Sequence, residues 1–427
     1  MTTVSVVGLL ESSLVATLYV GIVVGHTVLQ RRYARQHASR PLAPRSWTPR
    51  PTIDVIVPVL NEAPHLLRQC CEALRGQDYQ PIRVFLVDDR SDNIEDLRPL
   101  YERYGDLPGW TFVPLERRGG KRDAQDAAYR LGSGEFVLTV DSDTVIEPDT
   151  IRRLMDEIED DRVGAVTGNV RALNQADGLL TRLINWRYAL LFDLERAAHG
   201  RHRAVLCCTG PLSLYQRDAL VEVWDAYLRQ TFLNRRCVFG DDLQLTNLLL
   251  AKGYEARYAP DARALTEVPT RLRGYFRQQL RWNRSFYREL PWTRRALRGH
   301  RQGPKASWYL WFDVIARGLT PLLLAASLAR VGVDAVMARS WLLADGAMLM
   351  FMIVSSSVVA FWQTRSLPSS PDRPASRHEA LRLVLLYGLV HVILLVPARV
   401  WALVSLRRNG WGTRRVPAPA VAPAPAL

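Results

Sequence analysis

Two carboxylates, Asp141 and Asp143, flank Ser142 directly after the apolar run 136–140. Carboxylates at this spacing can share a hard divalent cation such as Mg²⁺ or Mn²⁺, which in turn binds a diphosphate. A sugar diphosphate departs poorly until its charge is neutralised, so the cation would act as a Lewis acid on the leaving group. The same triplet also occurs in solvated loops, but the predicted strand in front of it favours a metal site.

A second acidic pair, Asp88 and Asp89, follows the apolar run 82–87. In open parallel sheets, ligands bind outside the carboxyl ends of the strands. We therefore expect this pair to lie near Asp141 and Asp143. A carboxylate there can accept hydrogen bonds from a nucleobase or a ribose, and a helix N-cap is the alternative role for either residue.

A basic turn opens the predicted helix 121–131: Gly119 and Gly120 precede Lys121 and Arg122. Glycines allow a ligand to approach the backbone closely, and a helix N-terminus attracts anions. We expect Lys121 and Arg122 to face a phosphate group. The alternative is a basic turn in solvent, because this sequence is not a Walker motif.

Gly240 and the acidic pair Asp241 and Asp242 precede the amphipathic run 243–250. A carboxylate held at the start of a helix is fixed in place, which suits a general base that deprotonates an acceptor hydroxyl. Asp242 is the predicted base and Asp241 a predicted substrate contact. Simple capping of the helix is the alternative role for the pair.

Gln278, Arg281 and Trp282 share one basic helical stretch that leads into an apolar region. Arginine can contact phosphate with two parallel hydrogen bonds, and tryptophan offers a flat face for a sugar ring. We expect all three residues to bind substrate. Arginine and tryptophan are also common where helices meet lipid headgroups, so an interfacial belt is the alternative.

The segment that carries these motifs alternates short β-rich runs with helical patterns. Strands are predicted at residues 52–57, 82–87, 111–115, 136–140, 163–170 and 204–208, and helices at 64–75, 121–131 and 178–199. Strand, crossover helix and strand in repetition indicate an α/β fold whose mostly parallel sheet has helices on both faces. Such a sheet would bring the acidic motifs together at one edge.

Apolar segments lie at both ends of the chain. Residues 4–29 are long enough to cross a membrane, and Arg31, Arg32 and Arg35 follow them, which predicts a cytoplasmic C-terminal flank. A cleaved signal peptide would need a basic region before the apolar run. Further apolar spans are 306–329, 341–362 and 381–406, and the Pro/Ala tail 416–427 is expected to be disordered. Because three full crossings would leave the C-terminal arginines outside, the last span is expected to be interfacial or re-entrant, bent at Pro397.

The net charge of +14 requires an anionic partner. The basic segments adjoin apolar ones, which favours membrane lipids over nucleic acid. The five cysteines include two vicinal pairs and no C-x-x-C spacing. They therefore predict neither a disulfide framework nor a zinc site.

Together, in this order, the motifs resemble those of processive family 2 glycosyltransferases, which include the cellulose, chitin and hyaluronan synthases. The resemblance implies a membrane-bound enzyme with a GT-A-type domain at residues 51–300, an N-terminal transmembrane helix at 1–30 and channel-forming helices at 301–410. It implies that Asp88 and Asp89 contact uridine, that Asp141 and Asp143 hold diphosphate and metal, and that Asp242 is the base. Gln278, Arg281 and Trp282 would bind the diphosphate and the acceptor sugar.

Within the family, several stretches look most like hyaluronan synthase, including 180–183, 195–198, 208–213, 281–286 and 411–414. That reading implies UDP-GlcNAc and UDP-GlcA as donors, a growing polysaccharide as acceptor, and the cell membrane as location with a cytoplasmic catalytic domain. Rhizobial chitooligosaccharide synthases are similar, but would have Cys and Ala where this chain has Leu212 and Ser213. The alternative is therefore a chitin-type enzyme that uses UDP-GlcNAc alone.

The chain departs from the family pattern in three places. Arg90 replaces a glycine after the acidic pair, Leu60 replaces a tyrosine expected beside uracil, and Leu243-Gln244 replaces an arginine. Two other classes of protein fit the motifs less well. A non-processive lipid-linked transferase would usually lack the Gln278–Trp282 motif, and a basic membrane scaffold gives no reason for four carboxylate motifs.

Overall fold

The centre of the molecule is an eight-stranded sheet of order β3-β2-β1-β4-β7-β6-β10-β5. The computed structural model describes residues 3–299, 304–337, 342–365, 367 and 376–409. The strands are β1 (Ile53–Val59), β2 (Ile82–Asp88), β3 (Trp110–Pro114), β4 (Phe136–Val140), β5 (Thr144–Ile146), β6 (Val163–Ala172), β7 (Leu212–Gln216) and β10 (Glu255–Thr266). A separate two-stranded ribbon joins β8 (Thr231–Phe232) and β9 (Arg235–Arg236).

One half of the sheet is parallel and winds outward in two directions from β1. Strands β2 and β3 follow β1 on one side through α2 (Pro64–Arg75) and α3 (Ile94–Gly105). The chain then returns through α4 (Lys121–Leu131) to place β4 on the other side of β1. Because crossovers are right-handed, this reversal puts α4 on the opposite face. The strand order therefore reverses between β1 and β4, where ligands bind in such sheets.

The other half of the sheet is mixed, which the sequence did not predict. β7 runs antiparallel to both β4 and β6, and β5 runs antiparallel to β10. The strand predicted at 204–208 is wrong: Ala204 makes only an isolated bridge to Ala256, and the true strand is β7. Ala204, Val205, Leu206 and Cys208 are buried although they lie in a loop, so hydrophobicity alone misled the assignment.

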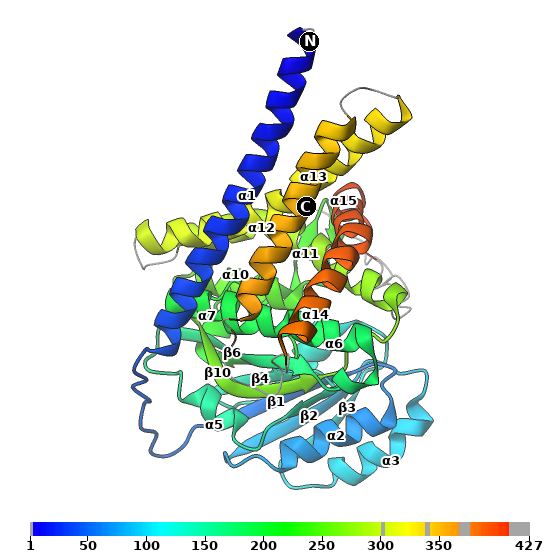
Figure 1. Cartoon of the computed structure of the whole chain (residues 1–427). Helices are drawn as coiled ribbons and strands as arrows, with labels where there is room; N and C mark the ends of the chain where they lie inside the picture. The colour runs from blue at the N-terminus through cyan, green and yellow to red at the C-terminus, as the bar shows by residue number, and fades with distance from the viewer. Residues whose placement is uncertain (1–2, 300–303, 338–341, 366, 368–375, 410–427) are drawn as a thin grey trace, which may run out of the picture.

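The helical segments 179–201, 241–251 and 272–299 lie between the sheet and the apolar helices (Figure 1). The predicted helix 178–199 is α6 (Leu179–Leu190), the π-helical turn η2 (Leu191–Arg196) and α7 (Ala197–Arg201). α10 (Asp241–Ala251) packs against the long α11 (Leu272–Gly299), which carries the Gln278–Trp282 motif. Shorter elements are α5 (Thr150–Met155), η1 (Gln175–Asp177), α8 (Arg217–Val221) and α9 (Trp224–Leu228).

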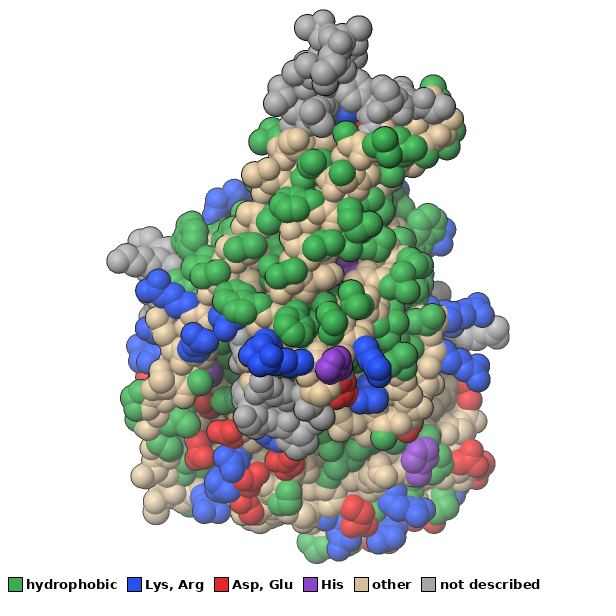
Figure 2. Space-filling view, viewed as in Figure 1, with side chains coloured by type: hydrophobic (Ala, Val, Ile, Leu, Met, Phe, Trp, Pro, Cys, Tyr) green, Lys and Arg blue, Asp and Glu red, His purple; other side chains and the backbone are tan. Residues whose placement is uncertain are grey.

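Four helical segments are long and apolar enough to cross a membrane. They are Ser12–Ala38 of α1 (Thr3–Ala38), Trp308–Val336 of α12 (Pro304–Val336), α13 (Leu342–Thr364), and Arg377–Val404, which joins α14 (Arg377–Val390), η3 (His391–Leu395) and α15 (Val396–Val404). α1 continues past the predicted boundary at residue 30. Hydrophobic side chains cover the upper part of the molecule, and Lys and Arg side chains form a band where these helices meet the sheet domain (Figure 2).

The last apolar segment contacts the sheet domain at both of its ends. Near its start, Arg182 of α6 forms an ion pair with Glu379. Just past its end, Arg284 of α11 donates to the Ser405 hydroxyl at 2.8 Å, and Arg288 also binds backbone carbonyl oxygens there. It is helical through Pro397 rather than a re-entrant loop, since the π-helical η3 lies just before that proline.

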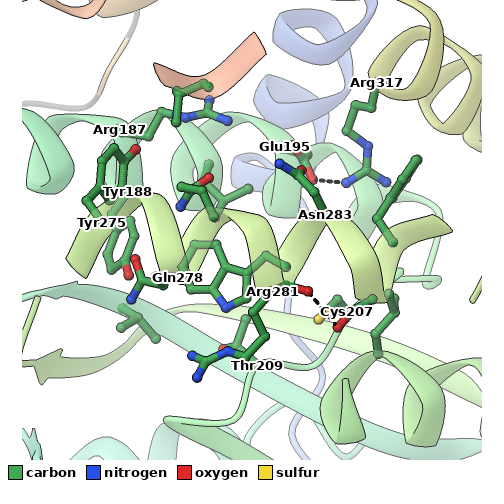
Figure 3. A pocket seen from close by; sticks show the side chains of 18 of the residues that line it. Arg187, Tyr188, Glu195, Cys207, Thr209, Tyr275, Gln278, Arg281, Asn283 and Arg317 are labelled. Carbon is green, nitrogen blue, oxygen red and sulfur yellow. Dashed lines mark hydrogen bonds and ion pairs between the residues drawn. The ribbon is translucent and has the colours of Figure 1, made fainter. Parts of the chain in front are cut away.

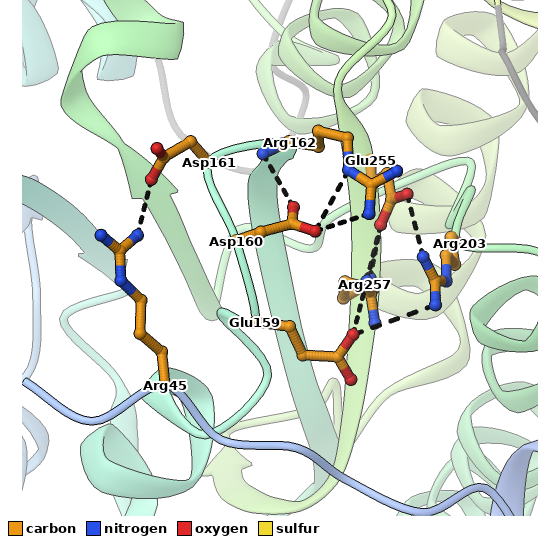
Figure 4. Close-up of polar contacts among 8 residues, drawn as sticks. All are labelled: Arg45, Glu159, Asp160, Asp161, Arg162, Arg203, Glu255 and Arg257. Carbon is orange, nitrogen blue, oxygen red and sulfur yellow. Dashed lines mark hydrogen bonds and ion pairs between the residues drawn. The ribbon is translucent and has the colours of Figure 1, made fainter.

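The link between α1 and β1 is fastened to the far side of the sheet by ion pairs (Figure 4). Arg45 binds Asp161 at 2.6 Å. Close by, the fully buried Arg257 binds Glu159 at 3.0 Å and Glu255 at 2.7 Å. The Arg45–Asp161 pair joins the link to the loop before β6, whereas the Arg257 pairs lie within the sheet domain. The predicted tail 416–427 lies outside the described residues.

Candidate active site

A single cavity of about 740 Å³ runs from the switch point of the sheet to the apolar helices. Nine of the predicted site residues line it: Asp89, Lys121, Asp141, Asp143, Asp241, Asp242, Gln278, Arg281 and Trp282. They come from loops after β2 and β4 and from the starts of α4, α10 and α11, all far apart in sequence. The sheet therefore brings the motifs together as their spacing predicted.

Lys121 connects two of the acidic motifs. Its Nζ lies 2.6 Å from Asp141 Oδ1 and 3.5 Å from Asp241 Oδ2. Burial alone would lower the pKa of Lys121, but Asp141 and Asp241 outweigh burial and raise that pKa above its usual value. Asp143 accepts a hydrogen bond from the Thr266 hydroxyl at 2.9 Å. Asp141 and Asp143 both line the cavity, and carboxylate oxygens are donors that fit a hard divalent cation.

The two carboxylates at the start of α10 have different surroundings. Burial opposes ionisation of Asp241, but Lys121 and Arg122 hold its pKa below the usual value. Burial and the charge of Asp241 raise the pKa of Asp242. Asp242 Oδ1 also accepts the Leu243 backbone N–H at 2.8 Å. A neighbouring pair whose pKa values move apart can divide its roles, and the raised member suits a proton acceptor.

Two predicted site residues do not line the cavity. Asp88 is buried, and its carboxylate accepts hydrogen bonds from the Tyr101 hydroxyl at 2.9 Å and the Ser91 N–H at 2.8 Å, so it closes the turn after β2. Arg122 is also buried and binds Tyr227, Gln230 and Gln244 instead of a phosphate. Arg122 is the second residue of α4, and its side chain points into the interior of the domain. The motif alone does not show this direction.

Asp89 lines the cavity, and it also shapes the basic turn. Its two oxygens accept the backbone N–H groups of Gly119 and Gly120 at 2.6 and 2.9 Å. Gly120 has φ of +90°, a conformation that favours glycine. The carboxylate therefore holds the turn that points Lys121 at the cavity.

The structure shows the surroundings of the three departures from the family pattern. Arg90 adopts φ of +56°, so it occupies the left-handed conformation for which a glycine is the usual residue. Its carbonyl oxygen accepts Arg118 Nη2 at 2.7 Å, which helps to hold the turn. Leu243, which directly follows the acidic pair, lines the cavity, and Gln244 accepts a hydrogen bond from Arg122. Leu60 lines the cavity.

The Gln278–Trp282 motif lies on the cavity side of α11 (Figure 3). Among the residues that the structure describes, the buried side-chain oxygen of Gln278 has no hydrogen-bond partner. Trp282 is 40% exposed, and its ring lies 6.5 Å from that of Tyr188 on α6, measured between centroids. Tyr275 also lines the cavity, as Tyr188 and Trp282 do. This aromatic surface is available to stack a sugar ring.

Beyond Trp282, the wall holds a charged network that sequence reasoning missed. Arg317 of α12 binds Glu195 of η2 at 2.7 Å and Asp313 at 2.8 Å (Figure 3). The fully buried Asp313 also contacts His26 of α1 at 2.8 Å and His199 of α7 at 3.1 Å. Asp313 and Arg317 are spaced i, i+4 within an apolar span, the one sequence signal that could have identified the network.

Comparison with known proteins identifies relatives over most of the chain. The family described as Glycosyl transferase family 2 matches residues 54–224. An N-acetylglucosaminyltransferase of Mesorhizobium japonicum is 39% identical, over 87% of this chain and 84% of its own. Those of Sinorhizobium fredii and Rhizobium meliloti are 39% and 35% identical, over 87% and 94% of this chain and 86% and 91% of their own.

A solved structure shares the fold. A mannosyltransferase of Pyrobaculum calidifontis, determined with GDP-Man and Mn²⁺, superposes with a TM-score of 0.60 at 22% identity, over 88% of this chain and 99% of its own. At this identity the match shows the architecture, and it confirms the predicted GT-A-type fold. The chain belongs to the family 2 glycosyltransferases, and it is similar over most of its length to rhizobial N-acetylglucosaminyltransferases.

Proposed function

We propose that this protein is a membrane-bound, inverting glycosyltransferase that adds N-acetylglucosamine from UDP-GlcNAc to a growing GlcNAc chain. The observation that carries the proposal is the convergence of Asp141, Asp143 and Asp242 with Trp282 around one cavity. The names of the relatives favour GlcNAc as the donor sugar. This is the alternative that the sequence left open beside hyaluronan synthesis.

Asp141 and Asp143 would hold Mg²⁺ or Mn²⁺, and the bound cation would neutralise the negative charge of the diphosphate. Lys121 and Arg281 line the same end and add positive charge for the departing UDP. Asp242 accepts the proton of the acceptor hydroxyl. The acceptor oxygen attacks the anomeric carbon on the side opposite the departing UDP. Gln278 offers its unpartnered oxygen to the substrate.

Two of the residues that favoured hyaluronan synthase do not line the cavity. Leu212 and Ser213 differ from the chitooligosaccharide synthase pattern, but both are fully buried in β7. They do not line the cavity, whereas the preceding Thr209, Gly210 and Pro211 do. A residue that does not reach the cavity cannot read the sugar directly, so this difference reports on packing in the sheet.

The contacts also support a membrane arrangement. Asp345 at the start of α13 binds Arg330 near the end of α12 at 2.9 Å, far from the sheet domain. Thr364 at the other end of α13 accepts the Trp186 indole N–H at 3.0 Å, next to that domain. We therefore propose that α1, α12 and α13 cross the membrane, with the last apolar segment lying against the catalytic domain. Arg407 and Arg408 then stay on the cytoplasmic side.

The test is product analysis with purified protein. We expect UDP-GlcNAc and Mn²⁺ alone to give a GlcNAc polymer or oligomer, which chitinase degrades, and excess EDTA to stop synthesis. Asp141→Ala and Asp143→Ala should lose Mn²⁺ binding together with activity. A product that requires UDP-GlcA as well, and that a hyaluronan-specific lyase degrades, would overturn the choice of sugar in favour of hyaluronan synthesis.

A further inference from the structure

Asn283 directly follows Trp282 on α11, and its side chain lines the same cavity (Figure 3). It lies outside the Gln278–Trp282 motif, and the mechanism proposed above does not use it. An amide side chain in a binding cavity can both donate and accept hydrogen bonds. Which of these Asn283 offers to a ligand depends on how the amide is oriented.

Arg399, in the last apolar segment, determines this orientation. Its Nη1 donates a hydrogen bond to Asn283 Oδ1. Because an arginine side chain has donors and no acceptor, this contact requires the amide oxygen and excludes the flipped amide. Among the residues that the structure describes, the amide nitrogen of Asn283 donates to none. Asn283 therefore presents N–H donors to the cavity.

Arg399 is itself held by contacts from two other helices. Its Nη2 donates to the backbone carbonyl oxygen of Arg317 in α12 at 2.5 Å. Its guanidinium carbon lies 4.5 Å from the ring centre of Phe286 and 5.1 Å from that of Tyr287, both on α11. Such cation–π contacts restrain the guanidinium further. The orientation of the Asn283 amide is therefore set before any ligand binds.

An apolar side chain lies next to these donors. Phe286 is three residues after Asn283, a spacing that places both on one side of α11, and it also lines the cavity. An acetamido group combines a carbonyl oxygen, which accepts hydrogen bonds, with a methyl group, which needs an apolar neighbour. An oriented N–H donor beside an aromatic ring suits both parts of that group.

We infer that Asn283 is a specificity-determining residue for the acceptor: its amide N–H donates to the acetamido carbonyl oxygen of an acceptor sugar, and Phe286 packs against the acetamido methyl group. Arg399 is the positioning residue that keeps the Asn283 oxygen away from the ligand. The inference rests on the proposed function and extends it from the donor sugar to the acceptor. A site built to hydrogen-bond one group rejects analogues that lack this group.

Binding of two trisaccharides to the full-length protein in detergent, with saturating UDP and Mn²⁺, tests the inference. Chitotriose carries an acetamido group on each sugar, and cellotriose has the same backbone with hydroxyl groups instead. We expect calorimetry to show tighter binding of chitotriose by the native protein. Asn283→Ala should weaken chitotriose binding about five- to tenfold, the value of one hydrogen bond, and leave cellotriose binding unchanged. Asn283→Asp should weaken it further, because it places acceptor oxygens opposite the carbonyl.

Changes at Arg399 test the positioning role. Arg399→Leu frees the Asn283 amide to turn, so it should lower the preference for chitotriose over cellotriose. Arg399→Lys keeps a donor for the Asn283 oxygen and should restore part of that preference, which a purely structural role does not predict. Gln363→Ala is the matched control. Gln363 is an amide of the same cavity whose nitrogen already donates to the Thr27 hydroxyl oxygen at 3.0 Å, so its loss should leave the preference unchanged.

Equal affinity of the native protein for the two trisaccharides, or equal losses for both in Asn283→Ala, would overturn the inference. Unchanged UDP affinity and thermal unfolding show that a variant keeps its fold and donor site. Product analysis separates this inference from the proposed function. A GlcNAc product made by a protein that does not distinguish the trisaccharides rejects the role of Asn283 alone. A preference for chitotriose that depends on Asn283, without any product from UDP-GlcNAc, rejects the proposed donor and supports the acceptor assignment.

Discussion

The two ends of the cavity use charge in opposite ways. At the sheet end, Asp141, Asp143 and Asp242 face the cavity with Lys121 as the ion-pair partner of Asp141. At the membrane end, Asp313 contacts two histidines and an arginine from three helices. Acidic groups outnumber basic ones at the first end, which leaves capacity for a cation and a substrate. At the second end, the charges satisfy one another.

The sheet end therefore has residues suited to chemistry, and the membrane end has residues that hold helices together. The Asp313 network ties α1, α7 and α12 to one another just beyond Trp282, so it fixes where these helices lie relative to the cavity. Glu195, His199 and Asp313 lie close enough together to share a metal ion. Arg317 bound to both carboxylates makes an ion-pair network the better description, because a cation already fills the position that a metal would take.

The largest effect is expected at the sheet end. Asp242→Asn should lower kcat by about 10²–10⁴-fold, the contribution of a general base, and leave UDP affinity near that of the native protein, because Asp242 acts on the acceptor. Single-turnover rates and calorimetric titration with UDP measure the two quantities. Asp225→Asn, at an exposed carboxylate on α9, is the control. Equal losses of rate and UDP affinity would contradict the assignment.

A change at the membrane end should act on stability instead. Asp313→Ala leaves Arg317 without one of its two carboxylate partners, and breaking a buried pair costs about 3–5 kcal/mol. We expect a lower melting temperature in detergent, no rescue by added Zn²⁺, and weaker protection of α1 from proteolysis. Glu95→Ala, which removes the exposed Glu95–Arg98 pair, should change little. Rescue of the melting temperature by Zn²⁺, together with Zn²⁺ binding to the native protein, would instead show a metal centre.

The smallest effect is expected where the two ends meet. Trp282→Ala should weaken retention of the growing chain about two- to tenfold, since aromatic stacking contributes ~0.5–1.5 kcal/mol. Products become shorter, UDP affinity is unchanged, and Trp282→Phe keeps part of the activity. Trp308, an exposed tryptophan on α12, provides the matched control. Normal product length in Trp282→Ala would make Trp282 an interfacial anchor like Trp308.

The sequence alone predicts the bounds of an element accurately where a local pattern of residues has a local physical cause. The helices at 64–75 and 121–131 and the strand at 136–140 were predicted to the residue, because each combines one hydrophobic period with clear ends. Acidic residues at strand ends predicted a shared cavity, since parallel strands bring their carboxyl ends to one edge. The apolar spans followed from length and composition.

Tertiary structure decided what depends on direction and on partners distant in sequence. Whether Asp88 and Arg122 face the cavity or the interior depends on Tyr101, Gln230 and Gln244, which no motif connects to them. The antiparallel β7 could not be predicted, because strand pairing follows from long-range packing rather than from local hydrophobicity. The contacts of Asp313 with His26 and His199 likewise join residues separated by 287 and 114 positions, so only the folded chain brings them together.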